Sequence, residues 1–265
     1  MQTIRLKSTG ADVVTLQQLL KKWGYLVDET GIFEKQTEAA LQEFQKSQHL
    51  GADGIAGPQT WAALQDEKAF MMSKLKLTEQ DFQQAALKLN VKVAAIKAVQ
   101  EVETGGRGGF FAVDHPAILF EGHIFWNQLK QFGINPNDHV KGNEDILYPK
   151  WTREFYKGGL AEYDRLERAK KIHEEAAICS ASWGMFQIMG FNYKVCGCKR
   201  ISEFAESMHA SEGQQLDLFV RFLKGNGWDK YLRNLDWAEF ALHYNGAGYA
   251  QNRYDEKLKN AYSKY

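Results

Sequence analysis

The sequence predicts a mainly helical protein made of a small N-terminal domain and a larger C-terminal domain. Two observations lead to this prediction: a short internal repeat encodes a compact helical unit within residues 1–66, and the clearly periodic segments after residue 78 are helical. At 265 residues the chain is long enough for both parts to bury a core. We expect domains at 1–66 and 80–265, joined by a short, stiff linker at 67–79.

The charge balance argues against polyanionic partners. Lysine plus arginine and aspartate plus glutamate both total 33, so no net field recruits nucleic acid or an anionic membrane surface. The chain has no apolar run of membrane-spanning length, and its N-terminus has no signal-peptide core. We therefore expect no nucleic-acid binding, no stable membrane insertion and synthesis in the cytoplasm. A monomer is the default expectation.

The three cysteines, Cys179, Cys196 and Cys198, are too few for a disulfide framework. The spacing of Cys196 and Cys198 does not fit a zinc knuckle, and no second pair accompanies them. We expect reduced, structural thiols, no metal site and no organic cofactor.

The internal repeat has a period of 23 residues. Residues 31–41 and 54–64 each contain a Gly-Ile turn, a Gln-Thr pair near a helix start and an Ala-Ala-Leu helix face. A further amphipathic helix is expected at 11–23. Together these segments predict a three-helix unit.

This unit resembles the peptidoglycan-binding type 1 domain family. The resemblance is carried by Leu6–Val13 (LKSTGADV), Gly24-Tyr25, Gly31-Ile32-Phe33 and Asp53–Trp61 (DGIAGPQTW). It implies a cell-wall anchor with peptidoglycan as its partner. The alternative is an inert three-helix module.

The segment from Val91 to Phe111 predicts an apolar helix that ends at the glycine pair 105–106. Glu103 follows Val99 by four residues and Ile96 by seven, which places it on the apolar side. Burial and the negative end of the helix dipole both disfavour a carboxylate, so the pKa of Glu103 should rise toward neutrality. Such a group is suited to act as a general acid. The alternative is a helix-end glutamate whose carboxylate reaches water.

Two charged segments are expected to stay in solvent. Glu101 follows Lys97 by four residues, the spacing of an exposed helical ion pair. Residues 165–175 (RLERAKKIHEE) read as a solvated helix face.

Three further segments carry polar residues next to apolar ones. Glu121 and His123 follow the buried run Ile118–Phe120, where they either border a site or satisfy loop backbone. Gln187 is the strong polar group of an apolar segment that contains a glycine, and its amide can donate and accept hydrogen bonds. Tyr244 and Asn245 end a helix that is followed by small residues, from where they can face a cleft.

In this order, the segments resemble the lysozyme-like superfamily, with its goose-type lysozymes and lytic transglycosylases. The motifs are Glu103-Thr104, Gly184–Gln187 (GMFQ) and Tyr244–Gly248 (YNGAG). The sequences of residues 118–123 and 181–190 resemble more closely the N-acetylmuramidase domain of endolysins from phages of Gram-negative bacteria. The resemblance covers about residues 80–265 and implies a lysozyme-like helical catalytic domain. Thr104 stands where the superfamily usually has serine.

By position, the resemblance implies Glu103 as the catalytic acid and Gln187, Tyr244 and Asn245 as substrate-binding residues of the cleft. Glycoside hydrolysis usually needs a second carboxylate, for which Glu121 and Asp114 are the candidates. We predict a peptidoglycan hydrolase that cleaves the β-1,4 bond between N-acetylmuramic acid and N-acetylglucosamine.

Two alternatives remain at this point. A lytic transglycosylase would use the same acid and give 1,6-anhydro products, and a non-catalytic wall-binding protein would cut nothing. For the hydrolase, we expect accumulation in the host cytoplasm and access to the wall after the membrane is permeabilised.

Overall fold

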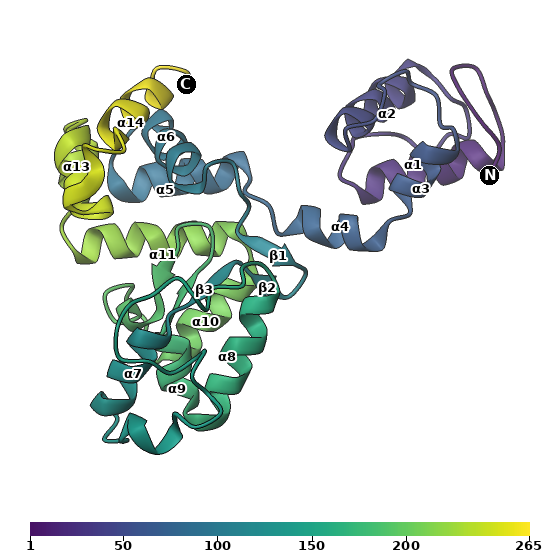
Figure 1. Cartoon of the computed structure of the whole chain (residues 1–265). Helices are drawn as coiled ribbons and strands as arrows, with labels where there is room; N and C mark the ends of the chain where they lie inside the picture. Colours follow the sequence, from purple (N-terminus) through teal and green to yellow (C-terminus); the bar gives the residue numbers. More distant parts are fainter. The chain divides into compact units, whose positions relative to one another are not determined.

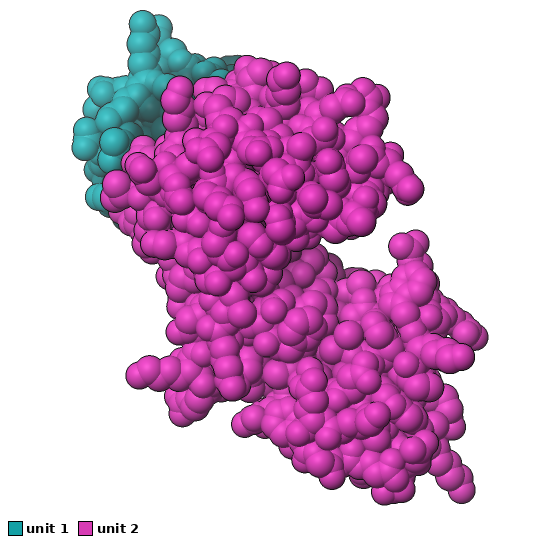
Figure 2. Space-filling view, turned by 90° about the vertical axis from the view of Figure 1, so that its left-hand side faces the viewer, with its two compact units in different colours: residues 1–73 teal, residues 74–265 magenta.

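The computed structural model describes residues 1–265 and divides into two compact units, Met1–Ser73 and Lys74–Tyr265 (Figure 2). Both units are built mainly of helices, and the only strands are five short ones in the second unit. The prediction of a mainly helical chain is confirmed. None of the helices combines the length and the apolar character needed to cross a membrane.

The first unit contains the three helices that the sequence predicts, packed around one core. They are α1 (Ala11–Lys22), α2 (Lys35–Ser47) and α3 (Pro58–Leu64), and α4 (Glu67–Lys74) follows them (Figure 1). Leu16, Leu41 and Phe44 are fully buried between the helices. The two repeats are therefore halves of one hydrophobic core.

Two buried glutamines explain the repeat. The Gln45 side chain accepts a hydrogen bond from the Gly54 N–H at 3.0 Å and donates to the Ile55 carbonyl at 3.0 Å and to Thr60 Oγ1 at 3.3 Å. Gln17 makes the equivalent contacts with Gly31, Ile32 and Thr37. Each glycine turn is thus fixed to a helix by one amide, and each repeated threonine is an acceptor for that amide.

The second unit begins its helical part with α5 (Glu79–Leu89), which starts after Thr78 and has Asp81 in its first turn. The two residues form a capping box: the Thr78 N–H donates to the Asp81 carboxylate at 2.8 Å, and the Asp81 N–H donates to Thr78 Oγ1 at 3.3 Å. The helix ends at Asn90, which adopts a left-handed conformation with φ of 55°.

The second unit also contains a small antiparallel sheet, whose strand β3 is labelled in Figure 1. In that sheet β3 (Ile118–Phe120) pairs with β4 (Ala181–Trp183), which pairs with β5 (Ile188–Met189); β1 (Phe110–Ala112) pairs separately with β2 (His115–Pro116). The helices are α5 (Glu79–Leu89), α6 (Val93–Thr104), α7 (Gly122–Gln131), α8 (Ala161–Ile172), α9 (Glu174–Cys179), α10 (Ile201–Ala210), α11 (Glu212–Gly225), α12 (Asp229–Arg233), α13 (Trp237–Asn245) and α14 (Tyr254–Tyr262). Short 3-10 helices lie at Pro136–His139, Gly190–Asn192 and Ala247–Tyr249.

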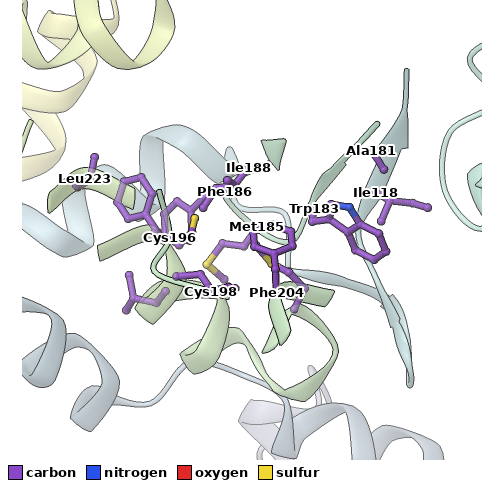
Figure 3. Close-up of a cluster of buried hydrophobic side chains, with 14 of the residues drawn as sticks. Ile118, Ala181, Trp183, Met185, Phe186, Ile188, Cys196, Cys198, Phe204 and Leu223 are labelled. Atoms are coloured by element: carbon purple, nitrogen blue, oxygen red, sulfur yellow. The ribbon is translucent and has the colours of Figure 1, made fainter. Parts of the chain in front are cut away.

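All three cysteines are buried and free. Figure 3 shows Cys196 and Cys198 among apolar side chains that include Met185 and Phe186. Burial raises the pKa of Cys196 to about 12 and that of Cys179 to about 11. The expectation of reduced structural thiols agrees with these surroundings, and no group of three metal-ligating side chains forms anywhere in the chain.

Candidate active site

A cavity of about 390 Å³ lies where the end of α6, strand β3 and the turn after β4 meet. Glu103 supplies its only carboxylate and Arg107 its only basic group. The cavity is lined by Glu103, Thr104, Arg107, Gly108, Phe111, Ala117, Ile118, Leu119, Gly158, Gly159, Gly184, Met185 and Gln187. One carboxylate in a wall of mainly apolar and backbone atoms is suited to proton-transfer chemistry.

Helix α6 places Glu103 in this cavity because its apolar residues face the core. Ile96 and Val99, on the same side as Glu103, are buried to 1% and 0% exposure. The helix ends at Gly105, which has a φ of 55° in the left-handed region. The predicted helix and its glycine stop are confirmed, and Glu103 lies in the last turn.

The pKa of Glu103 is raised from 4.5 to about 7. Burial is the dominant cause, because the neighbouring wall replaces the water that would solvate the charge. A hydrogen bond from Asn245 partly opposes this rise. The predicted direction of the shift is confirmed, and near neutral pH the protonated and ionised forms of Glu103 are both populated.

Asn245 is the last residue of α13, and it contacts Glu103 directly. Its Nδ2 group donates to the two carboxylate oxygens at 3.2 and 3.0 Å. Its Oδ1 atom is buried without a hydrogen-bond partner. The predicted sugar-binding role of Asn245 stays a prediction, while the structure gives this residue a contact that orients the Glu103 carboxylate.

The prediction that Glu101 forms an ion pair with Lys97 is wrong. Instead of Lys97, Glu101 contacts the Lys264 ammonium and accepts from the Tyr265 hydroxyl at 3.0 Å, which lowers its pKa. Lys97 pairs with Glu79 at 2.8 Å. Helix α14 packs closely on α6, so residues from distant parts of the chain compete with the neighbour four positions away.

Tyr244 does not line the cavity. Its hydroxyl donates to the Phe186 carbonyl at 2.8 Å, and its ring packs against Phe219 and Phe240. This contact holds the end of α13, and with it Asn245, next to the turn after β4. A substrate contact by Tyr244 stays a prediction.

Gln187 lines the cavity at the end of the same turn, with a φ of 49°. Its Nε2 group donates to the Gly184 carbonyl at 2.8 Å, and its Oε1 atom accepts from the Ser182 hydroxyl at 2.8 Å. The amide therefore closes the turn that forms one wall. Its exposed position leaves a substrate contact as a prediction.

Comparisons with known proteins identify the family of the chain. The model of the N-acetylmuramidase family matches residues 92–265, and that of a putative peptidoglycan binding domain matches residues 9–64. The chain belongs to the N-acetylmuramidase family. A solved structure, "Crystal structure of Burkholderia AP3 phage endolysin", is 40% identical and aligns over 99% of this chain and 98% of that one, with a TM-score of 0.68.

This N-acetylmuramidase is thus a peptidoglycan hydrolase that cuts glycan strands between N-acetylmuramic acid and N-acetylglucosamine. Peptidoglycan is its substrate, and the cell wall is where it acts. The non-catalytic alternative and the transglycosylase alternative are not favoured by these matches.

Neither candidate for a second carboxylate lines the cavity of the muramidase. Both oxygens of Glu121 lie 2.7 Å from the donating Tyr156 hydroxyl, and one lies 3.2 Å from Nδ1 of His123. Asp114 is exposed in the turn between β1 and β2, with a φ of 62°. The catalytic role of Glu121 stays a prediction, and in this structure its carboxylate is tied to Tyr156.

Sequence reasoning missed Gln215, a fully buried residue of α11 that connects two walls of the cavity. Its Oε1 atom accepts from the Met185 N–H at 2.8 Å, and its Nε2 group donates to the Gly109 carbonyl at 3.1 Å. A Cβ atom at Gly109 would lie 2.0 Å from the Gln215 oxygen. The second glycine pair of the segment, 108–109, was the signal that another group approaches the backbone there.

Sequence reasoning also missed a buried ion pair between Glu162 and Arg165. The prediction that residues 165–175 form a solvated helix face is wrong at Arg165. Glu162 and Arg165 are both 0% exposed and pair at 2.8 Å. Glu162 accepts from the Gly158 N–H at 2.9 Å and the Phe120 N–H at 3.2 Å, while Arg165 donates to the Phe120 carbonyl at 2.8 Å. The pair stays buried because it satisfies the end of β3 and the glycine loop of the cavity.

Proposed function

We propose that Glu103 is the general acid of the muramidase reaction. Its protonated carboxyl donates to the oxygen that bridges N-acetylmuramic acid and N-acetylglucosamine as the bond from that oxygen to the anomeric carbon breaks. The observation that carries this proposal is a pKa of about 7 on the one carboxylate of the cavity. Asn245 holds the two oxygens, and so fixes the direction in which the proton leaves.

We propose that water completes the reaction at the anomeric carbon, where its oxygen bonds and one of its protons passes to a base. We assign the role of this base to Glu121. Its support is the position directly after β3, whose residues Ile118 and Leu119 line the cavity. Gln187 and Tyr244 are assigned to the sugar-binding cleft on the basis of their place around the turn after β4.

The test is mass spectrometry of the soluble fragments that wild type and Glu103→Gln release from purified peptidoglycan. Wild type should release fragments with a reducing-end muramic acid, and Glu103→Gln should cut about 10²- to 10⁴-fold more slowly. Glu101→Gln is the matched control, because it alters the same helix and leaves the cavity intact. Equal cutting by Glu103→Gln and wild type would refute the assignment.

Glu121→Gln tests the second group in the same assay. A loss similar in size to that of Glu103→Gln supports a base, whereas activity close to wild type restricts Glu121 to its contact with Tyr156. Products one water lighter than the expected fragments would mean that a hydroxyl of the sugar attacks in place of water.

We infer that residues 1–66 anchor the enzyme to the wall and that residues 67–79 separate this anchor from the catalytic domain, 80–265. Anchoring raises the local concentration of the catalytic domain on its substrate without new chemistry. Glu103→Gln is expected to cut far more slowly than wild type, so its cosedimentation with intact sacculi measures binding to the wall with little cutting. Limited proteolysis should cut first within 67–79; a first cut inside either domain would contradict these boundaries.

We further propose that the protein is a monomeric endolysin that accumulates in the host cytoplasm and lyses the bacterium after the membrane is permeabilised. The similarity to a phage endolysin over nearly the whole chain supports this proposal. Cells that express the enzyme alone should stay intact until a permeabilising agent is added, and prompt lysis would contradict the proposal. Light scattering should give a mass near 30.3 kDa.

A further inference from the structure

We propose that Arg107 recognises a carboxylate of the muramic acid residue or its attached peptide, and so determines which glycan strands the enzyme cuts efficiently. This inference rests on the proposed function of the cavity. It concerns the only basic side chain of the cavity wall, which lies four residues beyond Glu103. Four observations support it.

The first observation is the turn that returns Arg107 to the end of α6. Gly105 and Gly106 both adopt positive φ values, 55° and 78°, which reverses the chain directly after the helix. The Arg107 N–H then donates to the Thr104 carbonyl at 3.0 Å, and Nε of its guanidinium donates to the same carbonyl at 3.3 Å. The Nε end of the guanidinium is thus fixed beside Thr104, the residue that follows Glu103.

The second observation is the anchoring of the chain on the other side of Arg107. The Gly109 N–H donates to the buried Glu212 carboxylate at 2.9 Å, and a Cβ atom at Gly108 would lie 2.5 Å from the Lys76 ammonium. Both flanks of Arg107 are therefore held by the protein. The side chain is presented on a fixed support, which lowers the entropy lost when it binds a ligand.

The third observation is that no carboxylate of the protein neutralises the charge of Arg107. Its two terminal nitrogens have no hydrogen-bond partner, and it forms no ion pair, whereas Arg165 and Arg168 are both paired with carboxylates. The pKa of Glu103 responds to burial and to Asn245, and Arg107 is not among its causes. Arg107 is exposed, and no carboxylate of the protein neutralises it, so its two terminal nitrogens are available for the substrate.

The fourth observation is chemical. In the alternating glycan, N-acetylglucosamine carries no carboxylate, while N-acetylmuramic acid carries a lactyl group that ends in a free carboxylate or in a peptide with carboxylates of its own. The two terminal nitrogens of a guanidinium match the two oxygens of a carboxylate. A guanidinium on the rim can therefore distinguish the two sugars and set the register of the strand at Glu103.

The experiment compares Arg107→Gln and Arg107→Lys with wild type on three glycans: peptide-bearing strands, strands stripped of peptide by an amidase, and peptide-bearing strands whose carboxylates are converted to amides. Lys171→Gln is the control for the loss of one positive charge, because Lys171 is exposed on α8 and does not line the cavity. Thermal unfolding of each variant verifies that its fold is intact.

Arg107→Gln should lower kcat/KM on a carboxylate-bearing glycan by about three- to tenfold, mainly through KM, with a smaller loss at high salt. Arg107→Lys should recover part of this loss, and conversion of the carboxylates to amides should abolish the difference from wild type. A defect on peptide-bearing strands alone assigns the contact to the peptide, and a defect on stripped strands assigns it to the lactyl carboxylate.

A defect that persists on the amide-converted glycan, or an Arg107→Gln enzyme equal to wild type on all three glycans, would overturn the inference. Failure of the proposed function has a different signature. In that case Glu103→Gln cuts as fast as wild type, whatever the charge on the substrate.

Discussion

Glu103 and Glu162 are both withdrawn from water beside the same cavity, yet their pKa values move in opposite directions. Burial raises the pKa of Glu103 to about 7, with one opposing hydrogen bond. Burial also favours the neutral form of Glu162, but hydrogen bonds from the backbone of Gly158, Lys157 and Phe120, together with the charge of Arg165, outweigh it and lower the pKa.

The difference lies in what the protein supplies in place of water. Glu162 is in the first turn of α8, where the helix dipole favours a negative charge, and its backbone donors come from the preceding loop and from β3. Glu103 is in the last turn of α6, where the dipole has the opposite effect, and Asn245 is its one side-chain donor. A carboxylate becomes an acid useful near neutral pH where donors are few, and becomes a structural anion where donors are many.

The largest expected effect is on stability, through Glu162. Glu162→Gln removes the charge opposite the fully buried Arg165, and an uncompensated buried charge costs about 3–5 kcal/mol. Chemical denaturation at pH 7 should show this loss in the unfolding of the second unit. Glu103→Gln is the control and should cause no loss. If Glu162→Gln lowers the free energy of unfolding by less than about 1 kcal/mol, Arg165 does not need Glu162 to stay buried.

The second effect is the pH dependence of stability that Glu103 introduces. Its pKa is higher in the folded protein, about 7, than its ordinary value of 4.5, so the folded state holds the proton more tightly. Ionisation of the buried Glu103 lowers the free energy of unfolding. This loss is absent below about pH 4.5, grows up to about pH 7, and amounts to about 3 kcal/mol above that. Glu103→Gln should therefore become more stable than wild type as the pH rises from 5 to 8, by urea denaturation. A pH-independent difference would contradict the raised pKa.

The third effect separates Asn245 from a purely structural residue. As the acid loses its proton, kcat/KM should fall about tenfold per pH unit above about pH 7. The hydrogen bond from Asn245 lowers the pKa of Glu103, so Asn245→Ala should move this alkaline limb to higher pH. If Asn245→Ala lowers kcat/KM and leaves the alkaline limb at the pH of wild type, Asn245 acts on the fold alone.

The smallest effect is expected at Glu101, two residues from the acid. Its partners, Lys264 and Tyr265, are exposed, and surface ion pairs contribute little. Activity of Glu101→Gln should stay within about twofold of wild type across the pH range. A loss of the size expected for Glu103→Gln would exchange the roles of the two glutamates.

The contrast between local and distant contacts explains how much of this site the sequence predicts. Glu103 follows from the spacing to Ile96 and Val99 within one helix, and its raised pKa follows from that burial. Its contact with Asn245 spans 142 residues, and the contact of Glu101 with Lys264 spans 163. Periodicity carries no information about such pairings, which depend on how α13 and α14 pack.

The same reason accounts for the residues whose burial was missed. Arg165 belongs to a segment that is charged on most sides, and Gln215 to an amphipathic helix with ordinary polar residues. Their burial depends on backbone groups that need partners at Phe120, Met185 and Gly109. Those needs arise only after strands and turns from separate parts of the chain have come together.

The buried thiols have a consequence for the range of conditions in which the enzyme works. Only a thiolate exchanges readily with disulfides or oxidants, and the raised pKa values of Cys179 and Cys196 leave almost none of it at neutral pH. No covalent crosslink holds the fold, so a reducing environment removes nothing from it. The molecule can pass from a reducing to an oxidising compartment with its covalent structure unchanged.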